Sequence, residues 1–193
     1  MPLMAANFVA FQTGWFACVL GGAWGHPWLG VAVVALIVAL HVVLAPIAGA
    51  ELKLLLAAAL VGTLWDSLLV SSGLLVYPSG QLAALMAPVW IIALWIAFAT
   101  SLNVTMRWLK GRHALAAVLG GVCGPLTFWG GARLGAVQFT DPLLALGALA
   151  VGWSLLMPLL VVLGERFDGW TGATAGELRQ PEERGDGELL DAH

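Results

Sequence analysis

Charged residues are scarce in this 193-residue chain, in which Asp, Glu, Lys and Arg together make up 10%. A soluble domain has roughly 25% charged and about 45–50% apolar residues, whereas 61% of this chain is hydrophobic and its mean hydropathy is +0.94. These figures exclude an ordinary soluble domain and indicate a membrane protein. The chain offers no basic surface suited to nucleic acid, so no nucleic-acid partner is expected.

Cysteine is also scarce. Cys18 and Cys123 both lie in apolar runs and lack the spacing of a disulfide framework or a metal site. We expect both to be small buried hydrophobic side chains. The four histidines are spread along the chain, so no metal site is predicted. The sequence also lacks a Walker loop, a GxGxxG motif and an HExxH motif, and it predicts no cofactor.

The charge is distributed unevenly along the chain. Residues 1–163 hold five basic and three acidic side chains, whereas residues 164–193 hold three arginines and eight acidic residues. We therefore divide the chain into a transmembrane domain at 1–163 and an acidic tail at 164–193. The tail is rich in glycine and cannot bury enough apolar surface to offset its ordering entropy, so we expect it to be disordered and cytoplasmic.

Breaks at glycine, proline and charged residues divide the transmembrane domain into six apolar stretches. A helix needs about 20 apolar residues to cross the hydrocarbon core, and only helices satisfy their own backbone groups in lipid. The predicted fold is therefore an all-α polytopic membrane bundle of six transmembrane helices, the first of them retained rather than cleaved as a signal peptide. The predicted helices lie near residues 5–24, 28–45, 52–76, 83–106, 114–138 and 143–163.

Lysine and arginine predict the orientation, because they accumulate in cytoplasmic loops. Lys53 opens the third helix, and Arg107, Lys110 and Arg112 follow the fourth. With six spans these positions lie on one side, together with Arg166. We therefore predict that both termini are cytoplasmic and that the membrane is a bacterial inner membrane. Aromatic residues near the predicted helix ends are expected at the membrane interfaces: Trp24, Trp28, Tyr77, Trp90, Trp108 and Trp129.

Asp66 is an isolated acidic residue in an apolar stretch, and such a residue usually faces a partner or a wet cavity because its charge is expensive in hydrocarbon. At 1.5 Å per residue, Asp66 lies roughly 21 Å and Arg133 roughly 28 Å along their outward-running helices. We predict that the two side chains form a buried ion pair between the third and fifth helices. In the alternative, Arg133 snorkels to the outer surface, and Asp66 is protonated or bonded to Ser67, Ser71 or Ser72.

A second group of polar residues lies toward the cytoplasmic side of the predicted bundle. Buried amides and carboxylates need hydrogen-bond partners, so we predict a polar cavity that receives a lipid headgroup or a small polar ligand. The alternative is that these side chains only join the helices through hydrogen bonds. The group comprises Asn7, Gln12, His41, Glu51, Thr100 and Asn103.

Small residues predict where helices pack most closely. The fifth helix contains Gly120-x-x-x-Gly124 and Gly131-x-x-x-Gly135. This spacing lets the backbone of a neighbouring helix approach.

Between residues 5 and 140 the chain contains, in this order, Asn7-x-x-x-Phe11-Gln12, Trp65-Asp66-Ser67-Leu68, Tyr77-Pro78, Pro88-x-Trp90, Phe98-Ala99-Thr100-x-Leu102-Asn103 and Gly131-x-Arg133-Leu134-Gly135. In combination these motifs resemble a family of small, uncharacterised multi-pass bacterial inner-membrane proteins with a domain of unknown function. One position departs from the family pattern, which has a histidine directly after the asparagine of the fourth helix. This chain has Val104 there, so a role that depends on that histidine is not carried over.

The resemblance implies a part in the modification of membrane lipids. Genes for such proteins often lie beside genes resembling cyclopropane-fatty-acid synthases and flavin-dependent oxidoreductases. Membrane lipids are therefore the expected partners, and a second copy of the chain or a lipid-modifying enzyme is the candidate protein partner. The resemblance supplies no catalytic role for any residue.

Three functional hypotheses remain open at this point. The first is a lipid- or isoprenoid-binding accessory component with headgroup contacts from Gln12, Glu51 and Asn103. The second is a small-molecule transporter with Asp66 and Arg133 in the translocation path. The third is a membrane-embedded enzyme that uses Asp66 or Glu51 as an acid or base.

Overall fold

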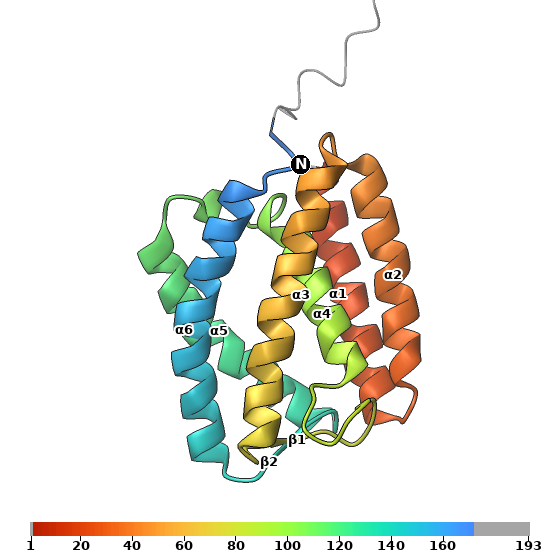
Figure 1. The fold of residues 1–193 in the computed structure, drawn as a ribbon, viewed down its shortest axis with the longest axis vertical. Helices are drawn as coiled ribbons and strands as arrows, with labels where there is room; N and C mark the ends of the chain where they lie inside the picture. The colour runs from red at the N-terminus through yellow and green to blue at the C-terminus, as the bar shows by residue number, and fades with distance from the viewer. Residues whose placement is uncertain (1, 172–193) are drawn as a thin grey trace, which may run out of the picture.

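The computed structural model describes residues 2–171, which form a bundle of six α-helices (Figure 1). The all-α fold class is therefore confirmed. A 3-10 turn and one two-stranded ribbon complete the described chain. In chain order the elements are α1 (Pro2–Ala23), α2 (Pro27–Leu44), α3 (Ala48–Ser71), β1 (Leu75–Val76), α4 (Val89–Leu102), η1 (Arg107–Leu109), α5 (His113–Arg133), β2 (Gln138–Phe139) and α6 (Pro142–Arg166).

The helix boundaries have simple local causes. Pro27 and Pro142 occupy the first positions of α2 and α6, where a missing N–H breaks no helical hydrogen bond. Asp141 caps α6, because its carboxylate accepts hydrogen bonds from the backbone N–H groups of Leu143 (3.0 Å) and Leu144 (3.1 Å). Gly25 makes the turn from α1 to α2 with a φ of 76°, a conformation that favours glycine.

Five of the helices, all except α4, are long and apolar enough to cross a membrane. Helix α4 has 14 residues and is about 21 Å long, shorter than the ~30 Å hydrocarbon core. It is buried along most of its length and lies in the middle of the bundle (Figure 1). The protein is therefore a multi-pass membrane protein whose shortest helix lies inside a ring of longer ones.

The prediction of a helix over 83–106 was too long. Helix α4 begins only after Pro88, whose backbone is extended (ψ 151°), and it ends at Leu102. The preceding connection is irregular, and two N–H groups at its end bind other parts of the protein: that of Val89 donates to the Gly80 carbonyl (2.9 Å), and that of Ala87 donates to Ser67 Oγ (3.0 Å). Irregular backbone is tolerated at the membrane only where the protein provides such partners.

A short antiparallel ribbon ties the two halves of the chain together. Strand β1 pairs with β2, with Leu75 opposite Phe139 and Val76 opposite Gln138. The ribbon thus joins the α3–α4 connection to the α5–α6 connection. It lies at the end of the bundle opposite the N-terminus (Figure 1).

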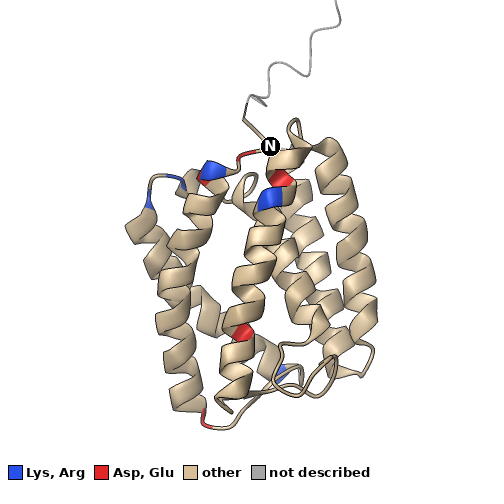
Figure 2. Ribbon diagram, viewed as in Figure 1, with Lys and Arg blue, Asp and Glu red and all other residues tan. Residues whose placement is uncertain are grey.

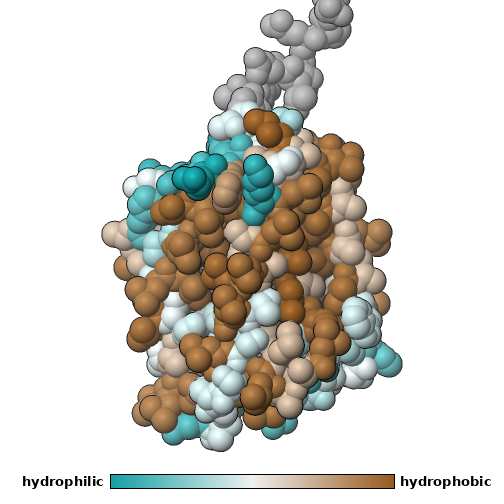
Figure 3. All heavy atoms as spheres, in the orientation of Figure 1, coloured by the Kyte–Doolittle hydropathy of each residue, from teal (hydrophilic) through white to brown (hydrophobic). Residues whose placement is uncertain are grey.

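The two ends of the bundle differ in their content of charged residues. Most lie where α1 and α3 begin and α6 ends, and few lie elsewhere (Figure 2). We call this the basic end, because Lys53, Arg107, Lys110, Arg112 and Arg166 belong to the segments that meet there. The middle of the surface is predominantly hydrophobic (Figure 3), as expected for a face in contact with acyl chains.

Four of the six aromatic residues expected at the interfaces are at least half exposed, namely Trp24, Trp28, Trp108 and Trp129. The other two are buried, with 4% of Tyr77 and 2% of Trp90 exposed. The Trp90 indole donates to the Ser79 carbonyl (3.2 Å) and its ring lies edge-on to Tyr77. Both rings are therefore packed inside the protein instead of facing the headgroups.

Glycines accommodate tryptophans between the helices. A side chain at Gly120 or Gly124 of α5 would collide with Trp153 of α6, so the first GxxxG motif allows close packing of α5 on α6. The second motif has another role. Gly131 faces only the neighbouring Val137, and Gly135 forms the turn after α5 with a φ of 85°.

The chain after residue 163 departs from the predicted domain boundary. Helix α6 continues to Arg166, and the segment 167–171 folds against the beginning of α3. We call residues 167–171 the C-terminal clasp. The prediction of disorder from 164 onward is therefore wrong for 164–171, and the rest of the acidic tail, 172–193, lies outside the described residues.

Candidate functional site

A cavity of about 610 Å³ separates α1 and α4 from α5. It exists because α5 packs along α6, whereas α1 packs along α2 and α4. The walls are mainly aromatic and aliphatic. Their aromatic members are Phe11, Trp15, Tyr77, Trp90, Trp95, Phe98, Trp108, Phe128 and Trp153.

The cavity reaches the surface of the bundle along α5. Three of its lining residues, Cys123, Leu126 and Thr127, are exposed side chains of α5. The two cysteines consequently differ: Cys18 is completely buried, as predicted, whereas Cys123 is exposed, contrary to prediction. Because the exposed surface of a membrane helix faces lipid, this side of the cavity is accessible from the acyl chains, and Trp108, also exposed, lines the cavity at the basic end.

Asp66 of α3 belongs to the wall of this cavity and is completely buried. Its Oδ2 accepts a hydrogen bond from the Trp95 indole N–H (2.6 Å), and its Oδ1 accepts one from the Tyr77 hydroxyl (3.3 Å). Gly62, one turn earlier on α3, has no side chain and leaves the room that the Trp95 ring occupies. Helix α3 therefore both leaves room for the indole and accepts the hydrogen bond from its N–H.

The structure does not bring Asp66 and Arg133 together. Arg133 is exposed, and its guanidinium lies 5.9 Å from the centre of the Trp129 ring. No ion pair within residues 2–171 involves either residue. The prediction of a buried pair was therefore wrong. Arg133 ends α5 near the surface, and two aromatic donors, rather than a cation or a serine, satisfy Asp66.

The serines of the alternative prediction bind backbone groups instead. Ser71 and Ser72 each donate to a carbonyl one turn earlier in α3, and Ser67 accepts from the Ala87 N–H. They therefore do not compete for Asp66.

The second predicted group divides into separate parts. Gln12 of α1 lines the aromatic cavity. Asn7, also on α1, donates to the Thr100 carbonyl of α4 (3.1 Å) and accepts a hydrogen bond from the Thr105 hydroxyl. The Thr100 hydroxyl donates within α4, to the Ala97 carbonyl (2.7 Å). Asn7 and Thr100 thus join α1 to α4.

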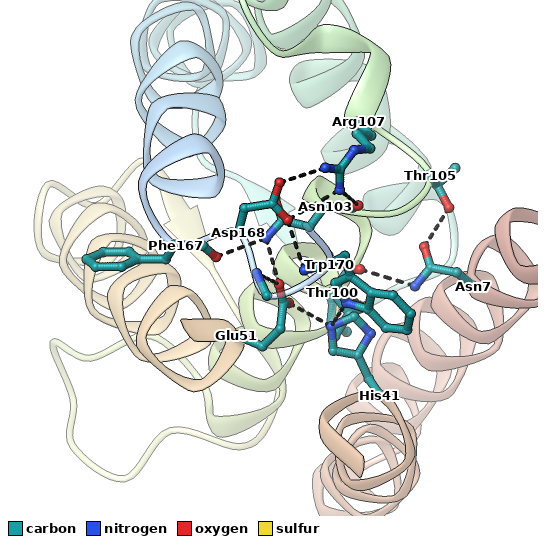
Figure 4. A network of polar contacts seen from close by, with 12 residues as sticks. Asn7, His41, Glu51, Thr100, Asn103, Thr105, Arg107, Phe167, Asp168 and Trp170 are labelled. Carbon is teal, nitrogen blue, oxygen red and sulfur yellow. Dashed lines mark hydrogen bonds and ion pairs between the residues drawn. The ribbon is translucent and has the colours of Figure 1, made fainter. Parts of the chain in front are cut away.

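Glu51 is the centre of the remaining part (Figure 4). Its Oε2 lies 2.8 Å from His41 Nε2, and its Oε1 accepts hydrogen bonds from Asn103 Nδ2 (2.7 Å) and the Gly169 backbone N–H (3.0 Å). Trp170 packs on the His41 ring, at 5.4 Å between ring centres. We call His41, Glu51, Asn103, Gly169 and Trp170 the Glu51 cluster.

The Glu51 cluster is a filled polar core. Its three ionisable or amide side chains are at most 7% exposed, and none of them belongs to the wall of the aromatic cavity. The sequence placed His41, Glu51 and Asn103 in one polar group with Asn7, Gln12 and Thr100, and it missed the clasp residues Gly169 and Trp170. The available signal was Trp170 itself, a large aromatic residue within an otherwise polar segment.

Asp168 fastens the clasp to the basic end. Its carboxylate accepts hydrogen bonds from Lys110 (2.7 Å) and Arg107 (2.8 Å), and its Oδ1 also accepts one from the Trp170 N–H (2.9 Å). Burial raises the pKa of Asp168, but the hydrogen bonds from Lys110 and Trp170 and the charges of Lys110 and Arg107 outweigh it. The net effect holds the pKa of Asp168 below its usual range.

The aromatic cavity therefore has space for a ligand, whereas the side chains of the Glu51 cluster bind one another. The aromatic cavity has an apolar volume, a lateral opening and a carboxylate in its wall. The Glu51 cluster joins α2, α3 and α4 to the clasp. No curated protein and no solved structure is significantly similar to the chain. Residues 4–159 match the model of the family described as "Protein of unknown function (DUF2878)", and the chain belongs to that family.

Proposed function

We propose that this membrane protein binds one apolar chain, of a lipid or an isoprenoid, in the aromatic cavity, as an accessory component of membrane-lipid modification. The observation that carries the proposal is the cavity itself. Its volume of about 610 Å³ falls within the ~300–1,000 Å³ of typical ligand pockets. Its walls are mainly hydrophobic, and its opening lies along the lipid-facing side of α5.

The size of the cavity favours a single chain. About 610 Å³ corresponds to ~20 water-sized volumes at ~30 Å³ each, enough for one acyl or isoprenoid chain but not for a whole diacyl lipid. Few polar groups are available to bind a large headgroup; among the lining side chains, Gln12, Thr127 and the indole N–H groups of Trp108 and Trp153 can donate hydrogen bonds. A headgroup would therefore remain near the opening while the chain enters.

We include in this proposal the number of membrane spans and the side of the membrane on which the termini lie. Six spans with both termini in the cytoplasm of a bacterial cell are supported by the basic end, since Lys and Arg accumulate on the cytoplasmic side. The transporter hypothesis loses its basis because Arg133 lies away from Asp66. The use of Glu51 as an acid or base loses its basis because Glu51 is enclosed by the clasp.

Protection of Cys123 from a thiol reagent tests the proposal. Cys123 is exposed and lines the cavity, whereas Cys18 is completely buried. In lipid nanodiscs, a maleimide should label Cys123, and added long-chain isoprenoid alcohol or fatty acid should slow the labelling in a saturable way. Native mass spectrometry of the purified protein should show one bound apolar molecule per chain.

Two glycine variants form a matched pair for this experiment. Gly130 lines the cavity and Gly147 does not, and a side chain at either position begins in open space. Gly130→Leu should reduce the bound ligand several-fold, whereas Gly147→Leu should leave it unchanged. If the two variants retain equal amounts of ligand, or if no ligand protects Cys123, the cavity is not the binding site.

A further inference from the structure

The buried carboxylate of Asp66 has two neutral donors and no cation. Both of its oxygens accept hydrogen bonds, from the Trp95 N–H and the Tyr77 hydroxyl. An indole N–H can only donate, so Oδ2 is an acceptor, whereas the Tyr77 hydroxyl can pair with Oδ1 in either protonation state of the acid. Among residues 2–171, no Lys, Arg or His contacts Asp66. A negative charge buried in a membrane helix without a partner is expensive, and a positive charge bound close to Asp66 would offset that cost.

The cavity next to Asp66 is built from aromatic rings that stand at different angles. Trp95 and Trp153 stack in parallel, with centres 4.8 Å apart, and Phe98 stands perpendicular to Trp153 at 5.7 Å. Tyr77 and Trp90 also meet at a right angle. The faces of aromatic rings carry negative electrostatic potential and attract cations, and aromatic cages of this kind bind quaternary ammonium groups.

The two hydrogen bonds to Asp66 come from rings of the cage. Trp95, Tyr77 and Asp66 all line the cavity, so the carboxylate lies in the wall together with the two rings that bind it. A cation in the cavity would be attracted by the ring faces and by the carboxylate beside them. In surroundings of low dielectric constant, such an attraction is much stronger than in water.

We propose that the aromatic cavity binds a lipophilic organic cation, an amine or quaternary ammonium group attached to an apolar chain, and that Asp66 provides the compensating charge. This inference rests on the proposed function, because it names the chemical class of the molecule that occupies the same cavity. Exposed Arg133 is not required, and Gln12 on the opposite helix remains available to hydrogen-bond an amine.

Two probes of nearly equal shape test the inference in the full chain. Benzyltrimethylammonium carries the cation, and neopentylbenzene is its neutral carbon isostere. Each is titrated against the rate of Cys123 labelling in lipid nanodiscs, and its partition is measured in nanodiscs without protein. After correction for partition, the cation should protect at concentrations at least tenfold lower than its isostere.

The variants separate the charge of Asp66 from the shape of the cavity. Asp66→Asn should weaken protection by the cation roughly 10- to 100-fold and leave protection by the isostere nearly unchanged. Asp141→Asn is the control, because it removes an exposed carboxylate but keeps a residue that caps α6 well. It should change neither probe's protection.

Each outcome decides between the two proposals. If neopentylbenzene protects and the cation has no advantage, the cation proposal is overturned while the apolar cavity stands. If neither probe protects while a long-chain fatty acid or isoprenoid alcohol does, the cation proposal fails and the apolar cavity stands; if none of them protects, both proposals fail. A cation preference that persists in a folded Asp66→Asn variant also overturns the inference. If that variant does not fold, the comparison of the two probes on the unmodified protein still decides.

Discussion

Replacing Glu51 by alanine should destabilise the protein more than any other single loss of a carboxylate at the basic end. Glu51 is completely buried and holds three partners, His41, Asn103 and the Gly169 N–H, at 2.7–3.0 Å. Removing one side of a buried charged interaction costs about 3–5 kcal/mol, because His41, the Gly169 N–H and one N–H of Asn103 would lose their common acceptor while they remain buried. We therefore expect Glu51→Ala to lower the free energy of unfolding by about 4 kcal/mol.

The conservative variant should cost less. Glu51→Gln keeps a carbonyl oxygen that can accept from Asn103 and Gly169, and it changes only the contact with His41. One altered buried hydrogen bond corresponds to about 1–2 kcal/mol. The control is Glu165→Ala, whose carboxylate contacts His113 and the Gly111 N–H in an exposed position. Exposed pairs contribute about 0–1 kcal/mol.

Thermal unfolding in detergent measures these differences. For a chain of this length, 1 kcal/mol corresponds to about 2–4 °C in Tm, so Glu51→Ala should lower Tm by about 8–16 °C. In a Cys123→Ser background, a thiol-reactive dye reports the exposure of buried Cys18 as the bundle opens. A Tm for Glu51→Ala within about 2 °C of Glu165→Ala would refute the reasoning, since burial of the carboxylate would then be without energetic consequence.

Two further predictions concern helix packing and pH. Gly124→Leu would force a side chain into Trp153 and should cost at least about 1–3 kcal/mol by overpacking, seen as a lower Tm than that of Gly147→Leu, whose site is open. The clasp should loosen in acid, because the folded-state pKa of Asp168 is lowered. Ionised Asp168 contributes its full stability above its unfolded-state pKa, which is near 3.9, and this contribution is lost as the pH falls through its lower folded-state pKa. The Tm difference between wild type and Asp168→Asn should therefore shrink between pH 6 and pH 3, and a constant difference would contradict this assignment.

The helices could be predicted from the sequence, but the length of α4 could not. Hydropathy reports that a segment avoids water, and residues 81–88 are apolar enough to extend a helix. Their backbone is nevertheless irregular, because the extended Pro88 precedes the first residue of α4 and because the Ser67 hydroxyl and the Gly80 carbonyl accept the N–H groups of Ala87 and Val89. Such long-range partners leave no trace in a local apolar pattern.

The candidate site could be predicted in part for the same reason. The sequence identified Asp66 as a buried residue, since a charge inside an apolar run is recognisable without a structure. Its partners Trp95 and Tyr77 lie 29 and 11 residues away, and aromatic residues in a membrane chain have many other uses. The distance counted along the third and fifth helices predicted that Arg133 and Asp66 lie at similar depths in the membrane. Similar depth does not determine the direction in which either side chain points.

The clasp has a consequence for the order in which the protein completes its fold. Glu51 is synthesised 118 residues before Gly169, an interval of about 6–24 s at ~5–20 residues per second. Until Gly169 arrives, the carboxylate lacks one of its donors, although the helices that surround it have already been made. The last stretch of the described chain therefore closes the bundle, and a nascent protein interrupted before residue 169 would enter the membrane with its first helices in place and its polar centre still open.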